Sequence, residues 1–174
     1  EFPVPFAPSF YGLDFSELPA LIGAFAYGPV AGVMIEFCKI LIKLVLKPSS
    51  TAFVGELANF SISCMLVLPA SVIYLFKKSR KQAILGTVVG TLIMTAFGSC
   101  FNAIYLLPKF SELYGIPLDA IIGMGTAINP AIHSISGLVL MCVVPLNLLK
   151  GGLVSLITIL VYKKLSPILK AAHK

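Results

Sequence analysis

The sequence predicts an all-α fold, that of a polytopic α-helical membrane protein, and two observations carry this prediction. Of the 174 residues, 58% are hydrophobic and 11% are charged, and the mean hydropathy is +0.99, a composition typical of a chain in lipid. Three uninterrupted apolar stretches, 57–76, 82–106 and 138–162, each hold the roughly 20 residues that a helix needs to cross a hydrocarbon core of about 30 Å. Because strands of a membrane barrel alternate apolar and polar residues, these continuous runs indicate helices.

A fourth apolar stretch, residues 18–46, is too long for one straight span, and Gly28-Pro29 divides it. Proline removes a helix donor and clashes with the preceding turn, so two helices are expected there, the first of them short. The chain is predicted to form one membrane domain, 1–174, with five helices at about 16–27, 29–46, 55–76, 82–106 and 138–163. The remaining segments are an external capping loop, 1–15, an external loop, 107–137, and a basic cytoplasmic tail, 163–174.

Basic residues gather in two short segments, which predicts the orientation of the chain in the membrane. One cluster is Lys77, Lys78, Arg80 and Lys81, and the other is Lys163, Lys164, Lys170 and Lys174. Basic residues beside spans favour the cytoplasmic side, and this orientation leaves residues 1–15 outside. The carboxylates expected on the outer side include Asp14, Glu17, Glu112 and Asp119. Because an external N-terminus requires an earlier crossing, we expect a membrane helix upstream of residue 1.

Small residues recur at every fourth position in the apolar stretch 18–46, at Ala20, Ala24, Gly28 and Gly32. In lipid, helices associate through close backbone approach at such stripes, because the hydrophobic effect does not drive them together. Two interpretations remain open: packing between helices of this chain, and a docking face for another membrane subunit.

A lysine within the last apolar stretch is the most informative polar residue of the chain. A charge near mid-helix costs roughly 2.5 to 3.5 kcal/mol on insertion scales, so Lys150 needs a partner. Asn147 lies three residues earlier on the same helical face. Together the two side chains offer donors and an acceptor to a polar ligand that enters from outside. The alternatives are an internal ion pair and a lysine whose amine reaches out to the membrane surface.

Three further polar side chains are predicted near the outer ends of their helices. Asn102 can contact the same ligand from the outer side, or it can bond to a carbonyl of a neighbouring helix. Glu56 and Asn59 share one face at the start of their helix, although a glutamate is also favoured in a first turn by the helix dipole. Glu36, Lys39 and Lys43 form a self-neutralising stripe that is expected to face protein or water rather than lipid.

The chain lacks the signatures of several other functional classes. The sequence contains no G-x-x-x-x-G-K-[ST] loop and no dinucleotide fingerprint, so energy for uphill transport must come from elsewhere. The four cysteines lack the spacing of metal ligands. The sequence also indicates no Cys or Ser nucleophile as a partner for either of the two histidines. The basic residues lie at the ends of spans, which indicates orientation in the membrane rather than nucleic-acid binding.

Three stretches in order, "LDFSELPALIGAFAYGPVAGVMIEFCKILI", "GELANF" and "NLLKGGLVS", resemble the riboflavin-specific S components of energy-coupling factor (ECF) transporters, the RibU family, over almost the whole chain. The resemblance implies a six-helix fold, of which this chain supplies five helices. It also implies that riboflavin enters from outside as the transported ligand, without any resident cofactor or metal. The implied contacts are Phe10, Tyr11, Gly12 and Asp14 at the tip of the capping loop, together with Asn102, Asn147 and Lys150.

The resemblance further implies assembly in a bacterial plasma membrane with a transmembrane coupling subunit, EcfT, and two ECF ATPases. ATP hydrolysis would tip the loaded S component toward the cytoplasm, with the small-residue face at Ala20, Ala24, Gly28 and Gly32 as the contact. One departure is Lys39-Ile40, where the family commonly has Lys-Asn. The alternatives are an S component for another vitamin and, from a different class, an autonomous carrier or channel. A carrier predicts an inverted repeat, and the sequence shows no matching pair of halves.

Overall fold

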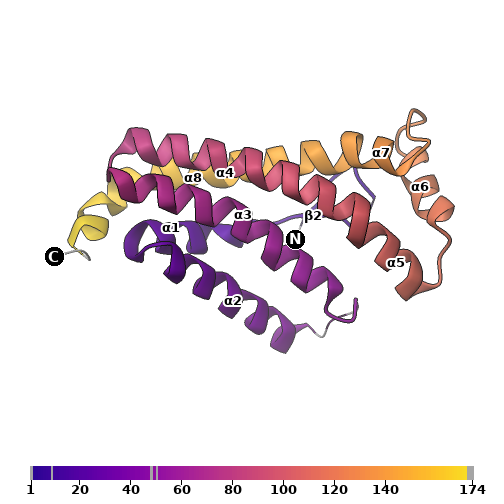
Figure 1. Cartoon of the computed structure of the whole chain (residues 1–174), viewed down its shortest axis with the longest axis horizontal. Helices are drawn as coiled ribbons and strands as arrows, with labels where there is room; N and C mark the ends of the chain where they lie inside the picture. The colour runs from indigo at the N-terminus through magenta and orange to yellow at the C-terminus, as the bar shows by residue number, and fades with distance from the viewer. Residues whose placement is uncertain (1, 9, 48, 50, 172–174) are drawn as a thin grey trace.

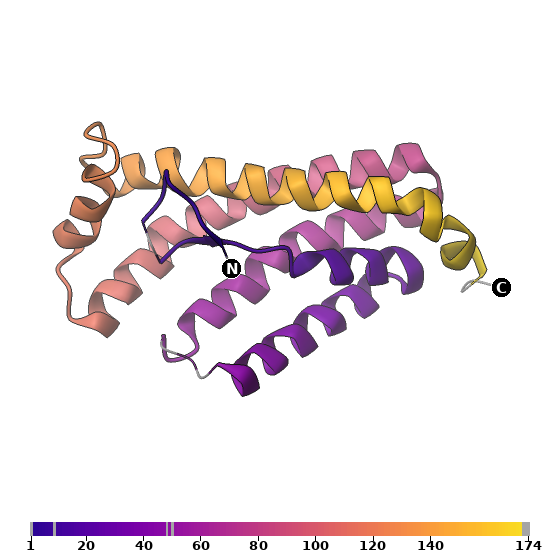
Figure 2. The same cartoon turned by 180° about the vertical axis from the view of Figure 1, so that it is seen from behind.

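The computed structural model describes residues 2–8, 10–47, 49 and 51–171, with the backbone alone for residue 3 and for 162–171. The chain folds into an elongated bundle of helices (Figure 1, Figure 2), and the prediction of an all-α fold is confirmed. Three long helices run side by side along its axis: α3 (Val54–Phe76), α4 (Arg80–Phe101) and α8 (Val144–Ala171). A hairpin of two shorter helices, α1 (Glu17–Tyr27) and α2 (Pro29–Leu46), packs against α3, and α1 also contacts α8.

The break between α1 and α2 falls at Gly28-Pro29, where the sequence predicts it. Gly28 has φ +96°, a left-handed conformation that glycine adopts without the steric cost of a side chain. Pro29 then begins α2, a position where its missing N–H breaks no helical hydrogen bond. The chain therefore reverses direction within one residue.

Three helical segments are long and apolar enough to cross a membrane by length and composition: Val54–Phe76, Arg80–Tyr114 and Ile135–Val161. They correspond to the three long apolar stretches of the sequence, and that prediction is confirmed. The other two predicted helices differ from them. Helix α1 has 11 residues, and α2 has 18 but includes Glu36, Lys39 and Lys43.

The predicted external loop, 107–137, is largely helical in the structure. Helix α4 continues through a π-helical segment, η1 (Asn102–Leu106), into α5 (Leu107–Tyr114), and a separate helix, α6 (Leu118–Thr126), follows. A short α7 (Ile135–Leu138) leads through a second π-helical segment, η2 (Val139–Val143), into α8.

Each π-helical segment ends just before a proline, Pro108 in α5 or Pro145 in α8. Both prolines therefore fall in the first turn after the change of helix type. Proline tolerates that position better than a helix interior, because there its missing N–H leaves fewer bonds unmade. The first of these segments lies at the predicted end of a helix, residue 106, and the helix continues beyond it into α5.

The capping segment, residues 2–16, contains a small sheet that the sequence did not predict. Strand β1 (Phe2–Pro3) pairs antiparallel with β2 (Gly12–Leu13), with Phe2 opposite Leu13. Tyr11 and Leu13 are buried in a cluster with Leu107, Leu138 and apolar residues of η2. The capping segment is thus held against the bundle at the level of the two π-helical segments.

The small-residue stripe packs inside the chain. Ala20 and Ala24 are completely buried, and Gly28 and Gly32 are also buried. A Cβ at Gly32 would lie 2.6 Å from the Cβ of Ala24 and 2.6 Å from Cγ1 of Val67. The structure therefore shows the first alternative, close packing of α1, α2 and α3. Ala20, Ala24 and Gly32 are thus engaged within the chain, and the docking role assigned to the four residues stays a prediction.

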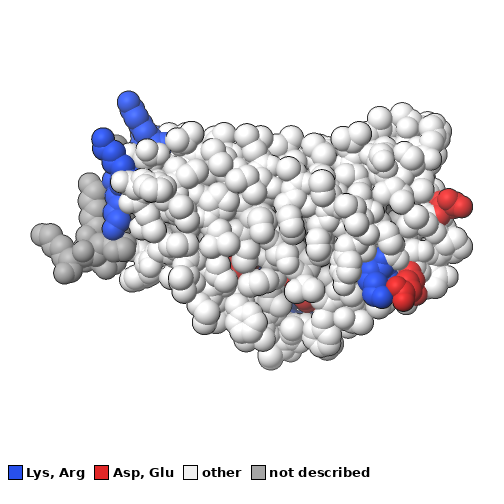
Figure 3. Space-filling model, in the orientation of Figure 1, with Lys and Arg blue, Asp and Glu red and all other residues white. Residues whose placement is uncertain are grey.

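On the face of the molecule drawn in Figure 3, charged side chains lie mainly at the two ends of the bundle. Lys77, Lys78, Arg80 and Lys81 surround the junction of α3 and α4. The exposed pair of Lys109 and Glu112 belongs to α5, toward the opposite end. Of the second predicted basic cluster, Lys174 and the side chains of Lys163, Lys164 and Lys170 lie outside the described residues.

Candidate ligand-binding site

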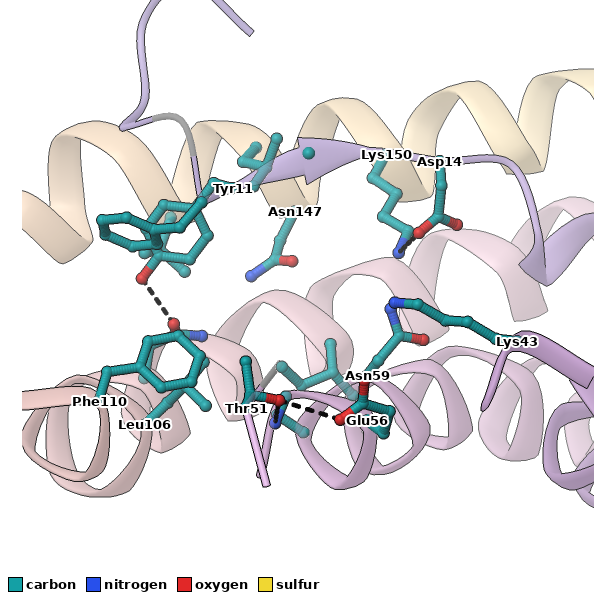
Figure 4. Close-up of a pocket in the computed structure, with 18 of the residues that line it drawn as sticks. Tyr11, Asp14, Lys43, Thr51, Glu56, Asn59, Leu106, Phe110, Asn147 and Lys150 are labelled. Atoms are coloured by element: carbon teal, nitrogen blue, oxygen red, sulfur yellow. Dashed lines mark hydrogen bonds and ion pairs between the residues drawn. The ribbon is translucent and has the colours of Figure 1, made fainter. Parts of the chain in front are cut away.

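A cavity of about 360 Å³ lies between the capping segment and the bundle, within the range of about 300 to 1,000 Å³ that small-molecule sites occupy. Its walls come from the tip of the capping segment, the start of α3, the two π-helical segments with α5, and the first part of α8 (Figure 4). All of the residues predicted to bind a ligand line this one cavity: Phe10, Tyr11, Gly12, Asp14, Glu56, Asn59, Asn102, Asn147 and Lys150. Their role toward a ligand stays a prediction.

Sequence reasoning did not identify the rest of the lining, which is mostly apolar or belongs to the α2–α3 connection. These residues are Lys43, Lys47, Thr51, Gly55, Ala58, Ile62, Leu106, Phe110, Tyr114, Val143 and Leu146. Apolar residues cover every helix of a membrane protein, so hydropathy carries no signal for those that face a cavity. Lys43 lies four residues after Lys39, on the same face of α2. This spacing could have indicated that Lys43 also faces the cavity.

The capping segment is anchored at one end of the cavity by a chain of hydrogen bonds. The Tyr11 hydroxyl donates to Oδ1 of Asn102 at 2.7 Å, and Nδ2 of Asn102 donates to the carbonyl of Gly98 at 2.7 Å. Burial raises the pKa of the Tyr11 phenol well above its usual range, so the hydroxyl stays a donor. Asn102 thus uses its amide both to bond a carbonyl on its own helix and to hold the cap.

At the other end of the cavity, Lys150 lies within an ion-pair network. Its amine is 2.5 Å from Oε1 of Glu17 and 3.5 Å from Oδ2 of Asp14. The internal ion pair, one of the alternatives left open by the sequence, is therefore present. A hollow also lies beside the amine, because Lys150 lines the cavity (Figure 4). An ammonium group carries three N–H donors, so these carboxylates do not exhaust its bonding capacity.

Asp14 connects the capping segment to this network. Its Oδ1 accepts hydrogen bonds from the backbone N–H and the hydroxyl of Ser16, at 3.1 and 2.6 Å. Burial acts to raise the pKa of Asp14, but the charge of Lys150 and the bonds from Ser16 outweigh it and hold the pKa below its usual range. Asp14 is therefore a carboxylate at neutral pH.

Glu17 is a residue of the network that sequence reasoning placed on the outer side of the membrane and did not assign to the site. It is completely buried, because the first turn of α1 faces α8 and α3. Besides Lys150, its Oε1 accepts from the Ser63 hydroxyl at 2.7 Å and lies 3.7 Å from the amine of Lys39. The signal that could have found Glu17 is the cost of burying Lys150, which requires a counter-ion at the same depth.

In the charged stripe of α2, formed by Glu36, Lys39 and Lys43, the pairing of Glu36 with Lys39 is present as predicted. The amine of Lys39 lies 2.5 Å from Oε2 of Glu36 and donates to Oδ1 of Asn59 at 3.2 Å. Glu36 is completely buried. The stripe thus faces protein, and through Asn59 it reaches the cavity wall.

Glu56 ties the α2–α3 connection to the cavity. Its Oε2 accepts from the hydroxyls of Ser49 and Thr51, at 2.8 and 3.0 Å. Ala52 and Phe53 in this connection have φ +46° and +67°, a left-handed conformation that costs non-glycine residues energy. The bonds to Glu56 help to hold this turn in place beside the cavity.

Asn147 supplies an unused hydrogen-bond donor in the cavity wall. It is 6% exposed, and among the described residues its buried Nδ2 makes no hydrogen bond. An amide N–H that is buried without an acceptor costs about 1 to 3 kcal/mol. An acceptor on a bound ligand would remove this penalty.

The cavity has the chemistry of a binding site rather than that of a catalytic one. Its polar groups are amides, hydroxyls, carboxylates and lysines, and His133 is not in its lining. Within the described part of the chain, no group of three or more His, Cys, Asp or Glu side chains is arranged to hold a metal ion.

A family model described as "ECF transporter, substrate-specific component" matches residues 2–162. The chain belongs to this family. It is the substrate-binding S component of an ECF transporter, a multi-pass membrane protein and not an enzyme.

The S component is similar to curated transporters along nearly its whole length. It is 34% identical to "Riboflavin transporter RibU" of Staphylococcus aureus (strain TCH60), with 98% of this chain and 82% of that protein covered. It is 30% identical to "Riboflavin transporter FmnP" of Bacillus subtilis (strain 168), with 95% of this chain and 82% of that protein covered.

Its fold also matches a solved structure titled "Structure and mechanism of the S component of a bacterial ECF transporter". The TM-score is 0.71 and the sequence identity is 34%, with 97% of this chain and 86% of that chain covered. The predicted fold class and the resemblance are therefore confirmed.

Proposed function

We propose that this S component binds riboflavin in the cavity beneath the capping segment and delivers it for import. The observation that carries the proposal is the cavity itself, where the capping tip, Asn102, Asn147 and Lys150 converge. Two relatives that share 30% or more of the sequence are named riboflavin transporters. Riboflavin is the cargo in this proposal, and the chain uses no resident cofactor or metal.

The two ends of the cavity suit the two kinds of surface on a flavin. Figure 4 places Tyr11, Leu106 and Phe110 at one end, where apolar and aromatic contacts favour a flat ring system. At the other end lie Lys150 and Asp14, near the unused amide N–H of Asn147. Donors and acceptors of this kind suit the carbonyls of the flavin pyrimidine ring and the ribityl hydroxyls.

In this proposal partner ATPases supply the energy for transport, since the sequence itself contains no nucleotide-binding loop. In this proposal the S component assembles with the coupling subunit EcfT and two ECF ATPases in a bacterial plasma membrane. The basic cluster at the α3–α4 junction favours the cytoplasmic side. The cavity would then open toward the outside, where the vitamin is captured.

Flavin absorbance and fluorescence test the binding proposal directly. Protein purified in detergent from a riboflavin-containing medium is expected to be yellow, and its flavin fluorescence is expected to be quenched. Protein stripped of ligand should quench added riboflavin with saturation at one equivalent, and excess thiamine or biotin should not compete. A colourless protein that leaves riboflavin fluorescence unchanged would contradict the proposal, and competition by another vitamin would favour the alternative ligand.

Uptake into vesicles tests the partners. Riboflavin uptake is expected to require ATP together with EcfT and both ATPases. Uptake by vesicles that contain the S component alone would instead support an autonomous carrier or channel.

A further inference from the structure

The carboxylate of Glu17 lies where four helices meet. It belongs to α1, and its Oε1 contacts Lys150 of α8 and Ser63 of α3, with Lys39 of α2 slightly farther away. The side chain is 1% exposed, and among the described residues its Oε2 makes no hydrogen bond. A buried carboxylate is costly unless it is paired, so its position calls for a specific role.

Glu17 acts through Lys150 and not on a ligand itself. Lys150 lines the cavity, whereas Glu17 does not contribute to the lining. The lysine amine sits at the end of a flexible four-carbon stem, and the shortest contact that fixes it is the one to Glu17, at 2.5 Å. The donors of the amine are thus directed by a group behind the cavity wall.

The two carboxylates that face Lys150 differ in how firmly they are held. Glu17 is buried in the bundle and receives a second hydrogen bond from Ser63 at 2.7 Å. Asp14 lies on the capping segment, 3.5 Å from the amine, with 13% of its side chain exposed. Glu17 is therefore the partner held within the bundle, and Asp14 is the partner that belongs to the capping segment.

We propose that Glu17 is a positioning residue for ligand binding, because its buried carboxylate holds the Lys150 amine at the cavity wall with donors left for the ligand. The inference rests on the proposed binding of riboflavin. Glu17 itself lies outside the cavity lining. Removing its charge would therefore weaken ligand binding only through Lys150. The pair of a buried acid and a cavity lysine then behaves as one unit.

Two measurements on the detergent-purified chain test this inference. The first is riboflavin affinity by fluorescence quenching, for Glu17→Gln, Lys150→Met and the double variant. Glu17→Gln keeps the size of the side chain and removes its charge, and it is expected to raise the Kd about tenfold or more. In the Lys150→Met background the same change is expected to alter the Kd by less than twofold, because coupled residues are not additive.

Glu112→Gln is the matched control, since Glu112 is also a carboxylate paired with a lysine, Lys109, and neither of these residues lines the cavity. Its Kd is expected to stay within twofold of wild type, and Glu17→Asp, which keeps the charge, is expected to recover part of the affinity. Wild-type affinity in Glu17→Gln would overturn the inference. Full additivity with Lys150→Met, or an equal loss in Glu112→Gln, would also overturn it.

The second measurement does not depend on riboflavin. Acetylation of the Lys150 amine by acetic anhydride is followed by mass spectrometry at a temperature where each variant is folded. The labelling rate at Lys150 is expected to rise at least tenfold in Glu17→Gln and to stay unchanged in Glu112→Gln. An unchanged rate in Glu17→Gln would show that Glu17 does not hold the amine, whether or not the wild type binds riboflavin.

Discussion

Replacing Gly32 by alanine tests whether the small-residue stripe packs within the chain. The new Cβ would lie 2.6 Å from both Ala24 Cβ and Val67 Cγ1, and 3.3 Å from the carbonyl of Ala20. Those neighbours are completely buried, so the helices must move apart. Overpacking of this kind costs about 1 to 3 kcal/mol, while the change from glycine to alanine in a helix returns up to about 1 kcal/mol.

Gly152→Ala is the matched control, because a Cβ at this helical position meets nothing within 4 Å. Both variants gain the same helix propensity, so the difference between them isolates the packing cost. We expect Gly32→Ala to be less stable than Gly152→Ala by about 1 to 3 kcal/mol in denaturant unfolding of the isolated chain in detergent. Equal stability of the two variants, with loss of assembly for Gly32→Ala alone, would instead make the stripe a docking face.

Three further outcomes are expected. Lys150→Met should weaken riboflavin binding by about 1.5 to 3 kcal/mol, the range for a hydrogen bond to a charged group, and an unchanged titration would remove Lys150 from the site. Tyr11→Phe should destabilise the capping segment by about 1 to 3 kcal/mol, because Oδ1 of buried Asn102 loses its donor. Faster proteolysis before residue 16 would report this loss. Protection equal to that of the wild type would argue against the hydrogen bond of Tyr11 to Asn102 as the anchor of this segment. Because the folded pKa of Asp14 is lowered, its stabilising contribution is present above the usual aspartate pKa of about 3.9 and is lost as pH falls below it. The stability difference between wild type and Asp14→Asn should therefore shrink between pH 6 and pH 3, and a constant difference would contradict the ion pair.

The five helices that the sequence predicted, α1 to α4 and α8, were predictable because each depends on local sequence. Long apolar runs define the spans, and Gly28-Pro29 marks a break through the backbone limits of those two residues alone. The site residues were found by a similar argument, since polar side chains in apolar helices must face protein or a ligand. That reasoning does not identify which partner neutralises a buried charge, because the partner comes from another helix.

Glu17 illustrates this limit. Its place in a first helical turn is explained by the helix dipole alone, so its sequence context gave no reason to bury it. The strand pair of the capping segment was missed for a related reason, because two residues on each side carry too little pattern to predict pairing. Helix α5 was missed because Pro108 suggests a stop, while the preceding π-helical segment lets the helix continue.

The most direct test is a structure of the purified chain with riboflavin bound. The account predicts that the flavin ring lies in the cavity between Phe110 and the capping segment, with acceptors within about 2.7 to 3.2 Å of Asn147 Nδ2 and Lys150 Nζ. A flavin bound elsewhere, with this cavity empty and Asn147 without a partner, would contradict it.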